Sequence, residues 1–437
     1  MTLLERIEKG EATVGIIGLG YVGLPLAVAT AKGGLTVIGF DIDASKVDQL
    51  YAGQSYIEAV TAPDLSEVAD RSSWTSDFAR LAECDVIVIC VPTPLTHNRE
   101  PDLSYVESTA RTIARHVTRD TLVVLESTTW PGTTEEVLKP ILSTSGHTPG
   151  EHLFIGFSPE REDPGNAQYG TRTIPKIVAG DGDMARQLIE AFYGRVVETV
   201  VTVPSPKVAE AVKITENIFR AVNIALVNEL KLIYDEMGID IWEVIDGAAT
   251  KPFGYMPFYP GPGLGGHCIP IDPFYLTWRA RQFDVPTRFI ELAGEINTNM
   301  PAHIVQRARE VLDGATGRGL NGAHVLLVGI AYKKNVSDMR ESPAMRLMEL
   351  LERAGAQVSF IDPHVSEIPP MREYSGFQGR EATDPEKIGS VGFDMAIIAT
   401  DHDAIEYPSI LDLGCPVVDT RNAIARRGLP MDRVTKA

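Results

Sequence analysis

Residues 14 to 41 carry a pattern that few folds accommodate. An apolar run, Val14–Ile17, is followed by Gly18-Leu-Gly-Tyr-Val-Gly23 and by an uncharged stretch to Ala31. A second apolar run at 36–40 then ends in Asp41. Strand, glycine-rich turn, helix, strand and acid, in this order and within about 30 residues, form the unit that binds dinucleotides in doubly wound sheets. The pattern therefore predicts an α/β fold with a parallel sheet.

The spacing of three glycines indicates what the turn does. Gly18 permits a tight turn, Gly20 lets the backbone approach a pyrophosphate, and Gly23 lets the helix pack on the strand. Asp41 would accept hydrogen bonds from the adenosine ribose and would repel a 2′-phosphate, which favours NAD over NADP. The alternative is a glycine-rich turn that holds no ligand. The two strands and the acid favour NAD as the cofactor.

The alternation of strands and helices continues, and several strands end in polar residues. Apolar runs at 85–90, 122–125 and 154–157 are followed by Thr93, by Glu126-Ser-Thr-Thr129 and by Ser158-Pro-Glu160. Ligands of doubly wound sheets bind outside the carboxyl ends of the parallel strands. We therefore expect Thr93, Thr129 and Glu160 to converge with Asp41 on one crevice. Taken alone, Glu160 would also fit an exposed loop.

The stretch from Ser205 to Met237 has apolar residues at helical spacing. It predicts a helix of roughly 50 Å at ~1.5 Å per residue. A helix of that length is longer than one small domain, so we expect it to bridge two domains and to supply a dimer face. Lys213 and Asn217 are four residues apart and share one side of it. Such residues usually face solvent, but the surrounding apolar face also allows a buried, liganded pair.

A second α/β region follows a polar, glycine-rich linker at 313–322. Apolar runs at 325–330 and 358–361 predict strands, the second of which ends in Asp362, and further strands are expected at 395–399 and 417–418. Only Gly329 stands where the first region has three glycines, so this region would bind a different nucleotide or serve as scaffold. The predicted domains are an NAD-binding domain at 1–203, a central helical region at 204–312 and a C-terminal Rossmann-like domain at 313–437.

Composition excludes several function classes. Forty Lys and Arg stand against 59 Asp and Glu, for a net charge of −19, which argues against a nucleic-acid or anionic-membrane surface. The cysteines at 84, 90, 268 and 415 form no C-x-x-C pair and no zinc spacing, so no metal is predicted and a reduced, cytoplasmic setting fits. The uncharged run from Val14 to Ala31 reaches membrane length, but its four glycines and Pro25 belong to the dinucleotide pattern.

Cys268 lies in a stretch that can form neither a helix nor a regular strand and is therefore expected to be a loop. The stretch from Tyr259 to Pro273 contains four glycines and four prolines, and Asp272 follows the cysteine by four residues. Such a loop brings backbone close to a ligand, and the glycines Gly263, Gly265 and Gly266 would let it press against one. The alternative is a linker that carries a buried thiol, because a single cysteine is weak evidence.

A thiol beside an NAD site has a specific use. An alcohol-level dehydrogenase needs no cysteine, but a thiol can add to an aldehyde, and the adduct can then be oxidised to a thioester that water hydrolyses. A cation such as Lys213 would favour the thiolate, and Lys213 with Asn217 would stabilise oxyanions. Glu160 and Asp272 are candidates to activate the water.

Five ordered motifs then identify a family. The chain resembles the UDP-glucose/GDP-mannose dehydrogenases, which are NAD-dependent nucleotide-sugar 6-dehydrogenases, over essentially its whole length. The motifs are Gly18-Leu-Gly-Tyr-Val-Gly23, Ser158-Pro-Glu160, Lys213-x-x-x-Asn217, Gly263-x-Gly-Gly-x-Cys268-x-x-x-Asp272 and Lys333-Lys-x-x-x-Asp-x-Arg-Glu-Ser342. The resemblance implies two successive oxidations at sugar C6, two NAD⁺ reduced and a uronic acid released, in polysaccharide or glycoconjugate precursor synthesis.

The resemblance also implies roles for individual residues. Cys268 would be the nucleophile, with Lys213, Asn217 and Asp272 as polar partners, and Thr129 and Glu160 would assist water or proton transfers. The implied NAD contacts are Gly18, Gly20, Tyr21, Val22, Gly23, Asp41, Lys46, Thr93, Thr129 and Arg340. The implied UDP-sugar contacts are Glu160, Arg161, Lys213, Asn217, Tyr259, Gly263, Tyr332, Lys333 and Arg421. The implied assembly is a homodimer or a higher homo-oligomer.

Within the family, the sequence around Cys268 is most similar to that of the bacterial UDP-N-acetylglucosamine 6-dehydrogenases. Two departures from the UDP-glucose type support this. Asp246-Gly-Ala-Ala249 has no arginine where that type carries one, and His267 precedes the cysteine where a smaller residue is usual. The alternatives are UDP-glucose, UDP-ManNAc or UDP-GalNAc as substrate, an alcohol-level dehydrogenase or epimerase that needs no thiol, and a catalytically silent nucleotide-sugar-binding module.

Overall fold

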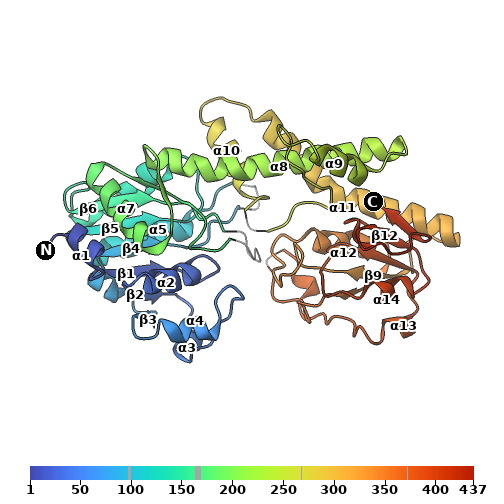
Figure 1. The fold of residues 1–437 in the computed structure, drawn as a ribbon, viewed down its shortest axis with the longest axis horizontal. Coiled ribbons are helices and arrows are strands. Elements are labelled where there is room, and N and C mark those ends of the chain that lie inside the picture. The colour runs from blue at the N-terminus through green and yellow to red at the C-terminus, as the bar shows by residue number, and fades with distance from the viewer. Residues whose placement is uncertain (97–99, 163–168, 267, 372) are drawn as a thin grey trace. The chain divides into compact units, whose positions relative to one another are not determined.

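The computed structural model, drawn in Figure 1, describes residues 1–96, 100–162, 169–266, 268–371 and 373–437. The chain divides into two compact units. Unit 1 contains Met1–Glu216 and Phe274–Val285, and unit 2 contains Asn217–Pro273 and Pro286–Ala437. Each unit is built around its own sheet, so the predicted α/β fold with two Rossmann-like sheets is confirmed. The predicted three-part division at residues 203 and 312 stays a prediction.

Within the described residues, the sheet of unit 1 has eight strands in the order β3-β2-β1-β4-β5-β6-β7-β8. Strand β1 lies between β2 and β4, parallel to both, with Val14 opposite Val37 and Val86. Strand β7 runs antiparallel to β6. The strands are β1 (Thr13–Ile17), β2 (Thr36–Phe40), β3 (Ser72–Thr75), β4 (Val86–Ile89), β5 (Thr121–Leu125), β6 (Leu153–Phe157), β7 (Lys176–Gly180) and β8 (Val200–Thr202).

Helices cover this sheet because its strands are apolar on both sides. Val86 and Val88 of β4 belong to a core cluster that also contains residues of α1, α2 and α7, and the alternate residues Ile87 and Ile89 are just as deeply buried. The helical segments of unit 1 are α1 (Leu3–Lys9), α2 (Gly23–Lys32), α3 (Ala44–Tyr51), α4 (Ala62–Glu67), η1 (Phe78–Glu83), α5 (Ser104–His116), η2 (Thr134–Leu138), α6 (Lys139–Leu142), η3 (Ser143–Ser145) and α7 (Asp183–Val196).

The long helix predicted from Ser205 to Met237 is confirmed as α8 (Pro206–Glu236), a single helix visible in Figure 1. Pro206 opens it, a position where the missing N–H of proline costs no helical hydrogen bond. The helix contributes residues to both units. Helix α10 (Asp272–Arg281) likewise begins in unit 2 and continues in unit 1. No helix of the described ranges is long and apolar enough to cross a bilayer.

The sheet of unit 2 has five parallel strands in the order β10-β9-β11-β12-β13. Val325 and Leu327 of β9 pack in a core with α11 and α12, whereas Leu326 and Val328 pack in a second core with α14 and α15. The strands are β9 (His324–Val328), β10 (Gln357–Ile361), β11 (Met395–Ile398), β12 (Val417–Asp419) and β13 (Val434–Lys436). The helical segments are α9 (Ile241–Ala249), α11 (Arg288–Thr316), α12 (Pro343–Arg353), η4 (Ser375–Phe377), α13 (Ile388–Val391), α14 (Tyr407–Leu411) and α15 (Ala423–Arg426).

One boundary predicted from composition is wrong. Residues 313–316 were assigned to the polar linker before the second sheet, but α11 continues through Thr316. Gly317 then ends the helix with φ 69°, a left-handed conformation that glycine adopts at low cost. The polar residues before it lie on the last turn of a helix whose buried face includes Ala308 and Leu312.

Candidate active site

The glycine-rich turn after β1 is shaped by close backbone contacts. Gly18 has φ 94°, and a Cβ on it would lie 2.6 Å from the carbonyl oxygen of Cys90. A Cβ on Gly23 would lie 1.9 Å from the carbonyl oxygen of Gly18. A Cβ on Gly20, in contrast, would have no heavy atom of the described chain within 4 Å. The outer glycines are thus required by the protein's own packing, and the middle one leaves a face of the backbone open.

Asp41 is fixed beside this turn. It directly follows β2 and is 6% exposed. One carboxylate oxygen accepts the backbone N–H of Leu19 at 2.9 Å, and the other accepts the backbone N–H of Asp43 at 2.9 Å. The Nζ atom of Lys46 lies 3.6 Å from the carboxylate. The turn, the acid and the lysine predicted for the cofactor therefore lie together. Tyr21, on the turn itself, has a side chain that is 40% exposed.

Two threonines at neighbouring strand ends are buried. Thr93, beyond β4, accepts a hydrogen bond from the Tyr275 hydroxyl on its backbone carbonyl at 2.7 Å. Thr129, beyond β5, is 1% exposed, and within the described ranges its hydroxyl has no hydrogen-bond partner. Leaving a buried hydroxyl unpaired costs about 1–3 kcal/mol. An open backbone face at Gly20 and an orphaned hydroxyl at Thr129 both fit a dinucleotide that supplies the missing contacts.

A buried glutamate ties the start of α8 to the turn that follows Thr129. The carboxylate of Glu210 accepts the backbone N–H groups of Gly132 and Thr134 and, at 2.7 Å, the hydroxyl of Thr134. Burial raises the pKa of Glu210 to about 7. Lys213 follows Glu210 by three residues on the same helix and is 8% exposed. Glu210 therefore fixes the helical turn that carries Lys213.

A buried cluster of charges lies beneath Glu160. The Nζ atom of Lys176, at the start of β7, is 2.8 Å from Glu160 and 3.0 Å from Glu126. Glu126 also accepts a hydrogen bond from the hydroxyl of Tyr193 on α7. All four residues are at most 8% exposed. The second oxygen of Glu160 accepts two backbone N–H groups, those of Arg161 and Glu162.

The cluster keeps Glu160 ionised. Burial alone would raise the pKa of Glu160, but the cations of Lys176 and Lys213 and the backbone N–H donors hold it below its usual value. Burial would lower the pKa of Lys176, but Glu126 and Glu160 raise it. Burial and the charge of Glu160 together raise the pKa of Glu162 to about 7. Two adjacent carboxyl groups with pKa values pushed apart are suited to proton transfer.

Arg161 has a different environment from the one expected of a substrate ligand. Its guanidinium pairs with both oxygens of Glu216 on α8, at 2.6 and 3.1 Å, and donates to the carbonyl of Pro175 at 2.8 Å. These contacts hold the segment after Glu160 against α8.

In unit 2, three predicted catalytic residues come together. The side-chain amide of Asn217 on α8 donates to Asp272 at 2.6 Å, and the backbone N–H of Asp272 donates to the carbonyl of Cys268 at 2.8 Å. Asp272 is 2% and Asn217 7% exposed. Asn217 is therefore buried, which is the alternative that the apolar surroundings allowed. His267 and residues 163–165, on which part of the family resemblance depends, lie outside the described residues.

The glycines of the Cys268 loop pack closely against other parts of unit 2. A Cβ on Gly265 would lie 2.7 Å from Cβ of Tyr332, and one on Gly266 2.9 Å from its ring. A Cβ on Gly263 would lie 3.2 Å from the carbonyl oxygen of Asn297. That oxygen has no helical partner because Pro301, four residues later in α11, lacks an N–H. Tyr332 or α11 therefore excludes a side chain at each of these glycines, and the expected approach of their backbone to a ligand stays a prediction.

The remaining predicted substrate residues surround the same loop. Tyr332 contacts Gly265 and Gly266, and Lys333 follows it. A Cβ on Gly261 would lie 2.5 Å from the guanidinium of Arg421, which also donates to the carbonyl of Ala399.

Two further predicted ligands already have partners within unit 2. Tyr259 donates its hydroxyl to Asp246 at 2.6 Å, and Arg426 stacks on its ring at 4.3 Å. Arg340 pairs with Asp338 at 2.7 Å, and its backbone carbonyl accepts the N–H of Gly266.

Sequence reasoning missed Lys176, Glu126 and Tyr193. Glu126 had a usable signal, since it directly follows an apolar strand as Asp41 does. Lys176 begins a strand and Tyr193 lies within a helix, and no local pattern distinguishes either from a surface residue. No group of three or more His, Cys, Asp or Glu side chains suited to a metal ion occurs in the part of the chain that the structure describes.

Comparison with known proteins agrees with this geometry. Three models of the UDP-glucose/GDP-mannose dehydrogenase family match the chain: its NAD binding domain over residues 12–197, its central domain over 207–299 and its UDP binding domain over 326–426. The predictions of the family and of NAD as cofactor are thereby confirmed, and the C-terminal region is a UDP-binding domain.

Individual relatives cover most of the chain. The UDP-N-acetyl-D-glucosamine 6-dehydrogenase of Pseudomonas aeruginosa is 37% identical over 367 residues, which are 83% of this chain and 86% of that protein. A UDP-N-acetyl-D-mannosamine dehydrogenase of Methanococcus maripaludis is 32% identical over 421 residues, 94% of this chain and 92% of its own. The structure of a UDP-D-ManNAc dehydrogenase from Pyrococcus horikoshii matches with a TM-score of 0.85 at 32% identity, over 94% of this chain and 96% of that one.

We predict that alanine substitutions at two of the turn glycines affect different properties, NADH binding at Gly20 and the stability of the fold at Gly23. Gly20→Ala should leave the free energy of unfolding within about 1 kcal/mol of wild type, because the space is open, but should weaken NADH binding roughly tenfold by obstructing the pyrophosphate. Gly23→Ala should destabilise the fold by about 3 kcal/mol. Urea unfolding and a fluorescence titration with NADH measure the two effects. Unchanged NADH affinity in Gly20→Ala would contradict the assignment of this turn.

We predict that Lys176→Met destabilises the protein by about 3–5 kcal/mol at pH 8, because two carboxylates remain buried without their cation. The loss should shrink at pH 5. Without Lys176 the pKa values of Glu126 and Glu160 rise, so protonation relieves the unpaired charge as the pH falls. Lys176→Arg keeps the charge and is the matched control. Urea unfolding at both pH values tests this, and a pH-independent loss would show that the charge is not what matters.

Proposed function

We propose, since this chain belongs to the UDP-glucose/GDP-mannose dehydrogenase family, that it oxidises C6 of UDP-N-acetylglucosamine from the alcohol to the carboxylate. Family membership makes it an NAD-dependent nucleotide-sugar dehydrogenase. The observation that carries the four-electron reaction is the arrangement of Cys268, Asp272 and Asn217 in the UDP-binding unit, where the backbone N–H of Asp272 donates to the carbonyl of Cys268 and Asn217 donates to the buried Asp272 carboxylate.

The residues can be assigned to successive steps. NAD⁺, when bound, accepts one hydride in each oxidation. In the first oxidation the C6 hydroxyl loses its proton to a base, for which Glu160 is a candidate because Lys176, Lys213 and backbone N–H groups keep it ionised. The thiolate of Cys268 then adds to the aldehyde and forms a C–S bond, and the adduct is oxidised to a thioester. Lys213 and Asn217 would stabilise the oxyanions.

Water completes the reaction. Attack on the thioester breaks the C–S bond, releases the acid and returns the thiol, and Asp272 or Glu160 would accept the proton of the water. The balance is one alcohol, one water and two NAD⁺ consumed, with one carboxylate, two NADH and three protons formed. The thiol is needed because it holds the aldehyde between the two oxidations, and an enzyme that stopped at the aldehyde would not need it.

The proposed sugar rests on the segment Asp246–Ala249 of α9. Asp246 accepts the hydroxyl of Tyr259 at 2.6 Å, which places this segment beside a proposed substrate ligand. No arginine is present in it, and the absence of a side chain that would bind sugar hydroxyls leaves room for an N-acetyl group. Relatives named for UDP-N-acetyl-D-glucosamine and for UDP-N-acetyl-D-mannosamine support an N-acetylated sugar.

The test compares UDP-GlcNAc, UDP-GalNAc, UDP-ManNAc and UDP-glucose with NAD⁺ under identical conditions. We predict the highest kcat/KM for UDP-GlcNAc and two NADH per sugar consumed. One NADH per sugar would indicate an alcohol-level dehydrogenase, and none would indicate an epimerase or a binding module. A higher kcat/KM for another sugar would contradict the specificity and leave the reaction intact.

We predict that Cys268→Ala lowers kcat by roughly a thousandfold or more, while calorimetry still detects binding of NADH and of UDP-GlcNAc. The cysteine forms the covalent adduct, and the proposed ligand contacts come from other residues. Cys415→Ala, which alters a buried cysteine of the core against α14 and α15, is the matched control and should retain activity. Undiminished acid production by Cys268→Ala would overturn the mechanism.

We also propose that the chain forms a homodimer through α8. Phe219, Leu226 and Ile233 recur every seven residues on this helix and are 47, 51 and 46% exposed. Such a seven-residue apolar stripe is suited to packing against another helix.

We predict that the double substitution Leu226→Asp and Ile233→Asp gives a monomer in sedimentation velocity. Two charges would have to be buried at the interface, which costs more than the contacts return. Glu229→Gln, at an exposed polar position between them, should sediment as wild type. A double variant that sediments with wild-type mass would exclude this face.

A further inference from the structure

The second sheet has an acid where the first has its cofactor acid. Asp362 directly follows β10, which lies beside β9, as Asp41 follows β2 beside β1. Gly329, after β9, has φ 76°, and a Cβ on it would lie 2.2 Å from the carbonyl oxygen of Thr400 beyond β11. Gly18 makes the same approach to Cys90 beyond β4. Asp362 therefore occupies the position of an acid that holds an adenosine ribose.

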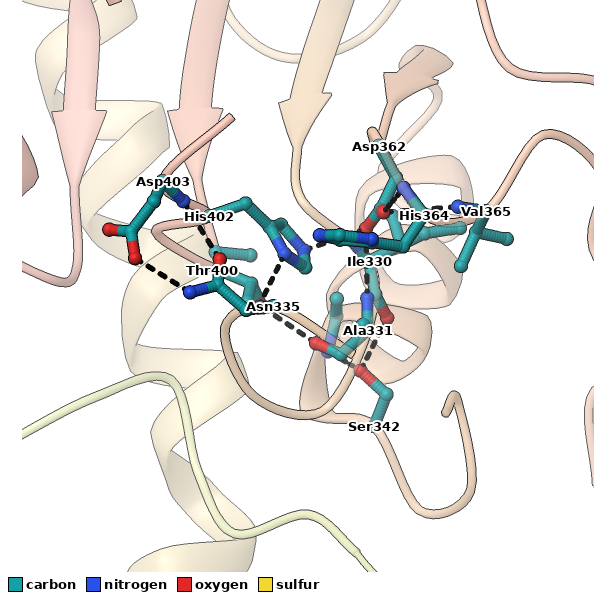
Figure 2. A network of polar contacts seen from close by, with 12 residues as sticks. Ile330, Ala331, Asn335, Ser342, Asp362, His364, Val365, Thr400, His402 and Asp403 are labelled. Carbon is teal, nitrogen blue, oxygen red and sulfur yellow. Dashed lines mark hydrogen bonds and ion pairs between the residues drawn. The ribbon is translucent and has the colours of Figure 1, made fainter. Parts of the chain in front are cut away.

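The side chain that binds this acid is an imidazole of the protein itself. The Nε2 atom of His402, from the loop after β11, lies 3.0 Å from Oδ2 of Asp362, and both side chains are completely buried. Figure 2 shows the ring of His402 between Asp362 and Asn335. The remaining capacity of Asp362 is used by backbone N–H groups of Ile330, Ala331, His364 and Val365. The second sheet thus satisfies its acid internally.

The other nitrogen of His402 holds the loop after β9. The backbone N–H of Asn335 donates to Nδ1 at 2.9 Å. A backbone N–H can only donate, so Nδ1 carries no proton and the ring is neutral, with its proton on Nε2 facing Asp362. His402 is thereby fixed in one tautomer by partners on both sides.

The loop Ile330–Asn335 is held at both ends by similar contacts, which Figure 2 also shows. Near its start, the hydroxyl of Ser342 donates to the carbonyl of Ile330 at 2.7 Å, and that of Thr400 donates to Ala331 at 2.6 Å. At its end, Asn335 has φ 62° and exchanges two hydrogen bonds with Asp403, at 2.6 and 3.0 Å. Tyr332 and Lys333 lie between these anchors.

We propose that neutral His402 is a positioning residue that holds the loop Ile330–Asn335 in its ligand-binding conformation. A proton taken up at Nδ1 in acid turns this acceptor into a donor that faces the N–H of Asn335, so the contact breaks and UDP-sugar binding weakens. The inference rests on the proposed function, which assigns Tyr332 and Lys333 to the UDP-sugar.

The charged groups around His402 set the direction of the effect. Burial would raise the pKa of Asp362, but the hydrogen bonds from His402 and from backbone N–H groups hold it below its usual value, so this carboxylate stays ionised. The ring of His364 lies 5.0 Å away. Asp403 is paired with Lys334 at 3.1 Å and with Arg427 at 3.5 Å. Because the proposed effect is the loss of the acceptor at Nδ1 that faces the N–H of Asn335, affinity should be full at alkaline pH and should fall as the solution is acidified.

The test is calorimetric binding of UDP between pH 8 and pH 5.5 to the full-length wild type, to His402→Gln and to His364→Gln. A glutamine at 402 offers an acceptor and a donor but cannot take up a proton. His364 is exposed and donates its backbone N–H to Asp362, so its variant is the matched control. We expect the Kd of wild type and His364→Gln to rise about tenfold on acidification, and that of His402→Gln to change less than about threefold, through the titration of UDP itself.

Two results would overturn the proposal: a wild-type Kd that is flat across this range, or a His402→Gln Kd that rises as steeply as wild type. If His402→Gln does not fold, His402→Asn replaces it, and the wild-type profile alone still decides the first result. Binding of UDP does not require turnover. Failure of the proposed reaction would appear as absent NADH formation with UDP binding intact, and is distinguishable from failure here.

Discussion

A buried pair of asparagines determines where the Cys268 loop can lie. Asn228 of α8 donates to Asn297 of α11 at 2.9 Å, Asn297 donates to the carbonyl of Ala221, and the N–H of Gly261 donates to Asn228 at 3.1 Å. Both asparagines are at most 3% exposed. Loss of either would leave polar groups unpaired in the interior, at about 1–3 kcal/mol each. The two long helices and the Cys268 loop are therefore fixed as one arrangement, and the packing of the glycines against Tyr332 follows from it.

The two sheets share one arrangement of a glycine and an acid at their strand ends, but the acid has different partners in each. In both, a glycine with positive φ follows the first strand and an acid follows its neighbour. In unit 1 the acid, Asp41, holds the turn and lies beside Lys46, and Gly20 leaves backbone open. In unit 2 the corresponding acid, Asp362, is hydrogen-bonded to His402 and to four backbone N–H groups. Two similar folds can therefore bind different ligands, depending on which groups hydrogen-bond to this acid, since a fold alone does not specify a ligand.

Much of this could be predicted from sequence because its signals are local. The glycine spacing, the acid after the second strand and the apolar spacing of α8 each depend on neighbouring residues, and the structure confirms the elements they predict. Lys176, Tyr193 and the asparagine pair could not be predicted, because their burial depends on elements that meet only in the folded chain. The glycines of the Cys268 loop could be identified from sequence but their contacts with Tyr332 and α11 could not, since sequence shows that a side chain is excluded without showing what excludes it. The last turn of α11 was missed because it is polar, with its buried residues further back.

The charge cluster under Glu160 is best explained by function. A buried ion pair rarely adds stability, because desolvation offsets the attraction, and apolar residues of similar volume often serve as well. Glu126, Lys176 and Tyr193 therefore need a reason other than stability. Without Lys176, burial would raise the pKa of Glu160, which is 8% exposed, and a protonated Glu160 could not serve as the proposed base. Lys176 keeps it ionised, and Glu126 with Tyr193 holds Lys176 in place. The chain has a net charge of −19, so its surface charge would not keep Glu160 ionised, whereas the buried cation of Lys176 does.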